Sequence, residues 1–183
     1  MKIGTPKERF EGEKRVAMTP QSALALKKLG YDSLIESGAG SAARFSDQAY
    51  RDAGVTVVPT AADLWAQADV VAKIRPPEPA EVEMARSGQI LLALINPGQD
   101  APLLEALKAK GVAALAMDMV PRISRAQKMD VLSSMANIAG YRAVIEAGNN
   151  FGRFFTGQIT AAGKVPPAKV LVVGAGVAGL AAI

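Results

Sequence analysis

Apolar positions along the first two thirds of the chain change spacing repeatedly, which predicts strands and helices in turn. Short runs of aliphatic and β-branched residues recur between polar stretches and lack the alternation of a half-exposed strand. Strands buried on both faces of a parallel sheet have this continuous apolar character. We expect strands at Lys2–Thr5, Ser33–Glu36, Val55–Val58, Val70–Ile74, Ile90–Leu94 and Val112–Met117.

Segments with helical spacing lie between these runs, and several carry signals at both ends. Thr19 and Pro20 open one such segment and Gly30 follows its last apolar residues, as expected for an N-cap, a first-turn proline and a C-terminal glycine. Similar signals mark helices at Asp47–Gly54, from Thr60 and at Asp100–Gly111. Alternating strands and helices predict an α/β fold, a doubly wound, flavodoxin- or Rossmann-like parallel sheet with helices on both faces.

The pattern breaks after Met117, where the polar loop Asp118–Asp130 follows a buried strand. Ligands of open α/β sheets bind at the carboxyl ends of strands, so this loop is a candidate for binding. The changes in pattern predict an N-terminal α/β domain over residues 1–131 and a connector helix with a linker over 132–168. Residues 169–183 are expected to begin a dinucleotide-binding Rossmann domain that is truncated here.

Two residue types are absent, and their absence narrows the chemistry. Without cysteine there is no disulfide or thiolate, and without histidine the commonest metal ligand and neutral-pH proton carrier is missing. We therefore expect no metal site. The net charge of +4 is spread over interspersed acidic and basic residues, which disfavours nucleic-acid binding. No secretory signal is evident, and no apolar run reaches the roughly 18 residues that cross a bilayer, so the pattern favours a soluble chain.

The segment Lys169–Val173 leads into a G-x-G-x-x-G motif at Gly174, Gly176 and Gly179. In a dinucleotide-binding turn the first glycine permits the tight turn, the second admits a pyrophosphate and the third lets helix and strand pack closely. Nucleotide binding, another adenosine-containing ligand, and a close-packed turn without ligand all fit the motif. The acidic residue that distinguishes NAD from NADP is expected about 20 positions on, beyond Ile183.

Other polar residues admit both a functional and a structural interpretation. Arg122 can donate to a carboxamide or phosphate, Gln127 can bridge polar partners, and Asp130 can accept from a ribose or cap the next helix. A solvated surface loop explains the same three residues. Arg15 and Lys73 can hold an anionic substrate or act as salt-bridge partners.

Three stretches give the chain a more specific resemblance. It closely resembles the alpha-subunit family of proton-translocating NAD(P) transhydrogenases from residue 1 to residue 183, most clearly over Pro121–Gln127, Ser133–Arg142 and Phe154–Pro167.

That resemblance implies an NAD(H)-binding component, homodimeric at full length, which passes hydride to NADP(H) on a partner component. Membrane-spanning partners couple the transfer to proton translocation, and the complex sits at the cytoplasmic face of the inner membrane. The resemblance implies that Arg122, Asp130 and Ser133 contact the nicotinamide end of NAD(H) and that Gln127 reaches toward the NADP-carrying partner. The three motif glycines, Gly174, Gly176 and Gly179, would hold the pyrophosphate.

Two alternatives to a transhydrogenase function also fit the sequence. The related alanine dehydrogenases bind their substrate carboxylate at the positions of Arg15 and Lys73, and they need a histidine as proton carrier. This chain has Asn96 at the matching place, which favours transhydrogenation because hydride exchange between nicotinamides requires positioning but no proton transfer. A catalytically inactive truncated module is the other alternative, because an unpaired first βα unit leaves an incomplete pocket.

Overall fold

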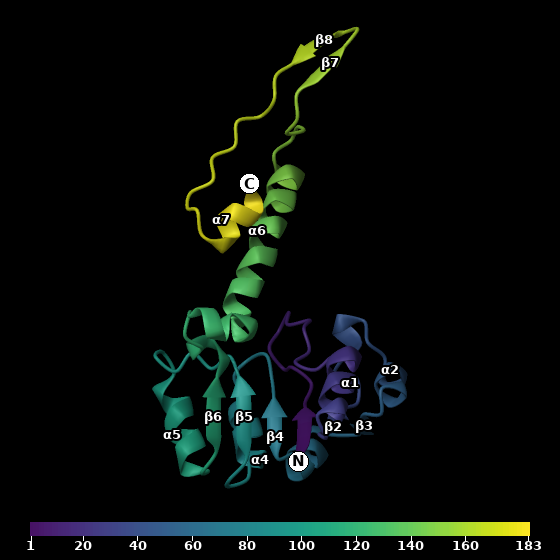
Figure 1. The fold of residues 1–183 in the computed structure, drawn as a ribbon, viewed down its shortest axis with the longest axis vertical. Coiled ribbons are helices and arrows are strands. Elements are labelled where there is room, and N and C mark those ends of the chain that lie inside the picture. Colours follow the sequence, from purple (N-terminus) through teal and green to yellow (C-terminus); the bar gives the residue numbers. More distant parts are fainter. The chain divides into compact units, whose positions relative to one another are not determined.

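The computed structural model describes residues 1–183 and divides into two compact units, Met1–Val120 and Pro121–Ile183. The first unit contains a six-stranded sheet (Figure 1). Its strands match the predicted runs to within two residues: β1 (Lys2–Thr5), β2 (Asp32–Glu36), β3 (Thr56–Val58), β4 (Val70–Ala72), β5 (Ile90–Ala93) and β6 (Ala113–Ala116).

All neighbouring strands of this sheet are parallel, in the order β3-β2-β1-β4-β5-β6. The order reverses direction between β1 and β4, so the connections on the two sides of this point leave in opposite directions. A crevice forms at the carboxyl ends of the strands at such a point, where ligands of doubly wound folds bind. The predicted fold class is therefore confirmed, and it has the strand order of a Rossmann sheet.

Five helices connect the strands, and three of them begin at the predicted capping residues Thr19, Thr60 and Asp100, whereas the helix expected to open at Asp47 is capped by Ser46 and the helix at Pro79–Met84 had no predicted signal. They are α1 (Pro20–Lys28), α2 (Asp47–Asp52), α3 (Ala61–Gln67), α4 (Pro79–Met84) and α5 (Ala101–Ala109), with short 3-10 turns η1 (Ser41–Ala43) and η2 (Met117–Met119). The side chains of Thr19, Thr60 and Asp100 each accept a hydrogen bond from the backbone N–H three residues on. These bonds satisfy N–H groups that a helix leaves without intrahelical partners.

Two hydrophobic clusters cover opposite faces of the sheet. Two adjacent residues of β2 belong to different clusters. Leu34 packs with Leu64 and Trp65 of α3, whereas Ile35 packs with Tyr50 of α2. The first cluster extends over α4 and α5, and the second lies under α1 and α2. Alternate side chains of a strand point to opposite faces, so β2 contributes to both cores.

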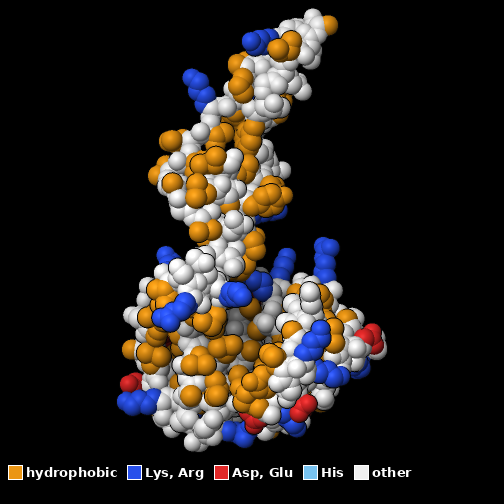
Figure 2. All heavy atoms as spheres, in the orientation of Figure 1, with side chains coloured by type: hydrophobic (Ala, Val, Ile, Leu, Met, Phe, Trp, Pro, Cys, Tyr) orange, Lys and Arg blue, Asp and Glu red, His pale blue; other side chains and the backbone are white.

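Helices lie on both faces, as predicted, but they cover the second face only in part. On that face α1 contacts β2 and α2 contacts β3, whereas the second cluster includes no residue of β4, β5 or β6. Leu92 and Leu115 are partners in the β5–β6 register, and Leu115 is 55% exposed. Hydrophobic side chains gather over this part of the sheet in Figure 2. The continuous apolar pattern of these strands therefore does not correspond to burial on both sides.

The second unit is built on one long helix, α6 (Val131–Asn150), preceded by a 3-10 segment η3 (Ser124–Met129). The predicted linker after it forms an antiparallel hairpin, β7 (Gln158–Thr160) and β8 (Gly163–Val165). The short helix α7 (Val177–Ala182) packs against α6 (Figure 1). None of the helices combines the length and apolarity needed to cross a lipid bilayer.

The strand expected at Lys169–Val173 is not formed. No other segment pairs with these residues, and Leu171 and Val173 are 86% and 90% exposed. A strand is stable only when its N–H and C=O groups bond to a neighbour. The apolar pattern of the segment fits a buried strand, but the segment has no neighbouring strand to pair with.

Leu64→Ala should destabilise the first unit by about 2–5 kcal/mol, because Leu64 is fully buried between α3 and β1 and its truncation leaves a cavity. Chemical denaturation followed by fluorescence of Trp65, the only tryptophan, measures the free energy of unfolding. Leu29→Ala, at a position 72% exposed, is the control and should change stability by less than about 0.5 kcal/mol. Equal losses in the two variants would contradict the assignment of this core.

Candidate functional site

The start of the second unit surrounds a cavity that collects four of the seven predicted site residues. The cavity has a volume of ≈ 590 Å³. It is lined by Pro121, Arg122, Ile123, Ser124, Gln127, Asp130, Ser133, Ser134 and Val177. All four residues predicted in the loop and at the helix start are thus brought to one place. Val177, which the sequence analysis did not single out, joins them as the first residue of α7, directly after Gly176.

Asp130 is fixed as the N-cap of α6. The backbone N–H of Ser133 donates to Oδ1 of Asp130 at 2.9 Å, and the Ser133 hydroxyl donates to Oδ2 at 2.6 Å. These two bonds, with the Arg122 charge as a smaller contribution, hold the pKa of Asp130 below its usual value. The predicted capping role is present, and the ionised carboxylate retains lone pairs that can accept from a ligand.

Arg122 and Gln127 lie on the exposed side of the same cavity. Neither side chain forms a hydrogen bond within the chain, whereas the intervening Ala126 is buried and anchors η3. A guanidinium carries five donors and an amide both donors and an acceptor. The cavity therefore presents unsatisfied donors beside a carboxylate, an arrangement suited to a planar carboxamide or a phosphate.

Two of the three motif glycines, Gly174 and Gly179, lie where a residue with a Cβ would be strained. Gly174 has φ +104°, a region that L side chains rarely adopt. A Cβ at Gly179 would stand 2.0 Å from the carbonyl oxygen of Gly174, so the turn closes only without one. A Cβ at Gly176 would meet nothing within 4 Å.

Gly176 therefore lies beside open space at the start of α7, where no side chain caps the helix. Backbone N–H groups at a helix start attract anions. The residues present fit a pyrophosphate at this turn, although the preceding segment is not a strand.

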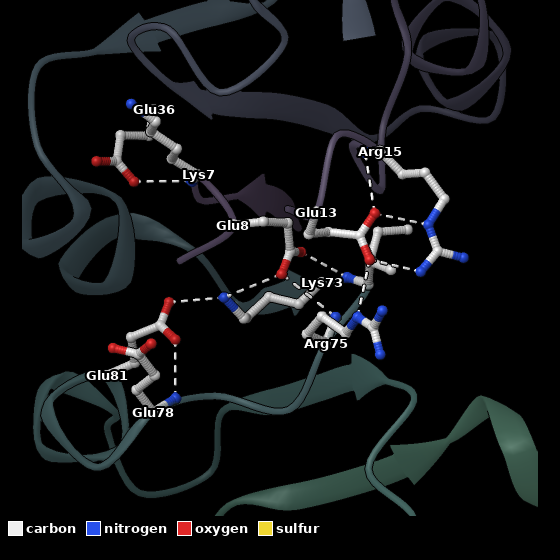
Figure 3. A network of polar contacts seen from close by, with 10 residues as sticks. Lys7, Glu8, Glu13, Arg15, Glu36, Lys73, Arg75, Glu78 and Glu81 are labelled. Atoms are coloured by element: carbon white, nitrogen blue, oxygen red, sulfur yellow. Dashed lines mark hydrogen bonds and ion pairs between the residues drawn. The ribbon is translucent and has the colours of Figure 1, made fainter. Parts of the chain in front are cut away.

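Lys73 lies at the carboxyl end of β4, in a buried charged cluster at the point where the strand order reverses (Figure 3). Its side chain is 1% exposed, and its Nζ lies 2.8 Å from Glu81 Oε1 and 3.6 Å from Glu8 Oε2. Glu8 also accepts from the backbone N–H groups of Ile74 and Arg75. Two carboxylates thus offset the free-energy cost of burying the ammonium group.

Glu13 holds the other two cations of this cluster. Arg15 donates through Nε to Glu13 Oε1 at 2.7 Å and through a terminal nitrogen to Oε2 at 2.6 Å, and Arg75 donates through Nε to Oε2 at 2.8 Å (Figure 3). The hydrogen bonds from the Arg15 side chain, and then those from its backbone N–H and from Arg75, lower the pKa of Glu13 to about 2.

Arg15 and Lys73 are candidates from the sequence, whereas the carboxylates that partner them, Glu8, Glu13 and Glu81, were not predicted. Only Glu13, two positions before Arg15, gives a signal in the sequence. With Arg75 the cluster holds three cations and three carboxylates, so it carries no excess positive charge.

Asn96 and Asp118 form a separate polar arrangement in the first unit. The backbone N–H groups of Ile95 and Asn96 donate to the two carboxylate oxygens of Asp118 at 3.1 and 2.7 Å. Asn96 adopts φ +47°, and its side-chain amide donates to Gln99. Asp118, predicted as part of the binding loop, therefore stabilises the turn after β5 and does not line the cavity of the second unit.

Glu13→Gln should lower the free energy of unfolding at neutral pH by an amount that disappears in acid. Because the folded-state pKa of Glu13 lies near 2, below its ordinary 4.5, the ionised side chain stabilises the protein above about pH 4.5. That contribution is lost as the pH falls toward 2. Urea denaturation of both proteins across this range measures the difference. Glu11→Gln, which removes an exposed carboxylate without an ion pair, should show no such pH dependence; a pH-independent effect of Glu13→Gln would contradict the assignment.

The chain matches family models along almost its whole length. The family model described as "Alanine dehydrogenase/PNT, N-terminal domain" matches residues 4–139, and "Alanine dehydrogenase/PNT, C-terminal domain" matches residues 143–183. The chain is 72% identical over its whole length to NAD(P) transhydrogenase subunit alpha of Cereibacter sphaeroides, of which it covers 35%.

Solved structures show the same relationship. The transhydrogenase of Sinorhizobium meliloti matches the whole chain with a TM-score of 0.95 at 45% identity, and the chain covers 54% of it. An L-alanine dehydrogenase matches the whole chain with a TM-score of 0.86 at 33% identity, and the chain covers 50% of it. The chain thus spans between about a third and a half of the length of these proteins.

Proposed function

The chain belongs to the alanine dehydrogenase/PNT family, and we propose that it forms the amino-terminal part of an NAD(H)-binding transhydrogenase component. This component transfers hydride between NAD(H) and NADP(H). The observation that carries the proposal is the single cavity where Arg122, Gln127, Asp130 and Ser133 meet Val177 of α7. Residues about 45 to 55 positions apart in the sequence thereby join a polar loop to the glycine turn.

In this proposal Arg122, Asp130 and Ser133 bind the nicotinamide end of the cofactor. Arg122 donates to the carboxamide oxygen and the ionised Asp130 accepts from the carboxamide nitrogen, while Ser133 fixes the orientation of that carboxylate. The N–H groups around Gly176 bind the pyrophosphate. The bound NAD(H) supplies the hydride chemistry, and the residues of this chain bind and orient it.

No acid–base residue is required for this role. Hydride transfer between two nicotinamide rings depends on alignment and exclusion of water and needs no proton carrier in the protein. The chain has no histidine, and its buried charged cluster is internally neutralised. The alanine dehydrogenase alternative needs a proton carrier, and Asn96, at the place of the expected histidine, does not supply one.

The partners follow from the same proposal. The Cereibacter sphaeroides relative is named as a subunit, so other subunits belong to its assembly. We propose that NADP(H) is carried by a partner component, toward which the exposed Gln127 is directed. Membrane-spanning components then couple the reaction to proton translocation at the cytoplasmic face of the inner membrane, and the component acts as a homodimer.

Gln127→Asn, tested in the full-length subunit, should slow hydride transfer to NADP(H) about tenfold or more while changing NADH affinity less than about threefold. The full-length subunit is a protein that contains this sequence and has the full length of its relatives. The shorter amide no longer reaches the partner's nucleotide, but Arg122 and Asp130 still bind NADH. Single-turnover kinetics and NADH fluorescence titration measure the two effects. Equal losses in transfer and binding would contradict the role given to Gln127.

Gly176→Ala separates nucleotide binding from simple close packing of the turn. A Cβ at Gly176 meets no protein atom, so the variant should fold with unchanged melting temperature, yet the Cβ obstructs a pyrophosphate. We expect NADH affinity of the full-length subunit to fall about tenfold or more, equivalent to about 1.4 kcal/mol. Gly98→Ala is the matched control, because its Cβ also meets nothing within 4 Å but lies in the first unit. If both variants bind NADH equally well, the turn serves packing alone.

A further inference from the structure

Gly140 is the single buried residue of the 20-residue helix α6. Glycine lowers helix propensity at such a central position, but its lack of a side chain lets another segment approach the helix backbone closely. A Cβ built at Gly140 would lie 2.0 Å from the carbonyl oxygen of Ala178 and 2.7 Å from its carbonyl carbon. The first turn of α7 therefore rests directly on the backbone of α6.

This contact lies next to residues of both halves of the proposed cofactor site. Ala178 follows Val177, which lines the cavity, and Gly176, which borders the open space of the glycine turn. Ser133 lies on the same helix as Gly140, about 10 Å away at 1.5 Å per residue. Because α6 is a continuous helix, the place where α7 touches it determines how far the glycine turn lies from Asp130 and Ser133.

We propose that Gly140 is a positioning residue that sets the spacing between the glycine turn and the cavity at Arg122–Ser133. The inference rests on the proposed function and extends it to a residue that touches no cofactor. A ligand that spans both halves of the site depends on this spacing, whereas a ligand that engages only the turn does not. NADH is of the first kind, and ADP, which lacks the nicotinamide, is of the second.

Gly140→Ala tests this spacing directly. The atoms facing the new Cβ are backbone atoms and cannot rotate away, so α7 must move by at least about 1 Å to restore ordinary contact distances. Displacements of about 1 Å at a reacting centre can lower rates about 100-fold. In the full-length subunit we expect NADH affinity to fall about tenfold or more and hydride transfer to fall further. ADP affinity should change by less than about threefold.

Gly148→Ala is the matched control in the same helix. Its Cβ would meet the ring of Phe155 at 3.7 Å, an ordinary contact, so both ligands should bind as they do to the unchanged protein. Folding of the first unit is monitored by Trp65 fluorescence, since neither of its cores contains a residue beyond Ala116.

The ratio of NADH to ADP affinity is the decisive quantity. Selective loss of NADH binding with ADP binding retained supports the proposal. Equal loss of both ligands, which includes complete undocking of α7, overturns it, as does an unchanged ratio with both affinities intact. If the unchanged full-length subunit binds ADP but not NADH, the proposed function itself fails, which is a different result from an insensitive ratio.

Discussion

Two hydrogen bonds from Ser133 to the carboxylate of Asp130 fix where α6 begins, and the candidate site depends on that start. They place an ionised carboxylate at the rim of the cavity and stabilise the first turn of the helix along which α7 packs. A helix start leaves N–H groups without partners, and a carboxylate cap both satisfies them and interacts favourably with the helix dipole. One residue thus serves the fold and remains able to accept from a ligand.

The chain uses its charges in two contrasting ways. Around Lys73 the cations are matched by carboxylates within the protein, and the buried cluster holds the loop after β1 against the end of β4. At the cavity of the second unit, Arg122 and Gln127 keep their donors exposed. Burial of charge is tolerated only with partners, whereas binding a polar ligand requires donors without them. The contrast supports an assignment of ligand binding to the cavity of the second unit.

The strands and caps of the first unit could be predicted because their signals are local. Thr19 and Asp100 cap the predicted helices, and β1 has the predicted bounds. The segment Lys169–Val173 shows the limit of such prediction, since its apolar residues fit a strand but nothing in the structure pairs with it. Pairing is a non-local interaction, and a sequence pattern records only the suitability of a segment for it.

The site divides in the same way. The need for glycine at Gly174 and Gly179 could be predicted from sequence, because φ and the tolerance for a Cβ are properties of a short motif. The carboxylates around Lys73, the junction of Val177 with Asp130, and the contact of Gly140 with Ala178 have no such local signal. The sequence by itself determined the strands of the first unit, three of its helix starts and the glycine turn. Only the tertiary structure decided which charges are neutralised and which distant residues share a cavity, because both depend on contacts between segments far apart in the chain.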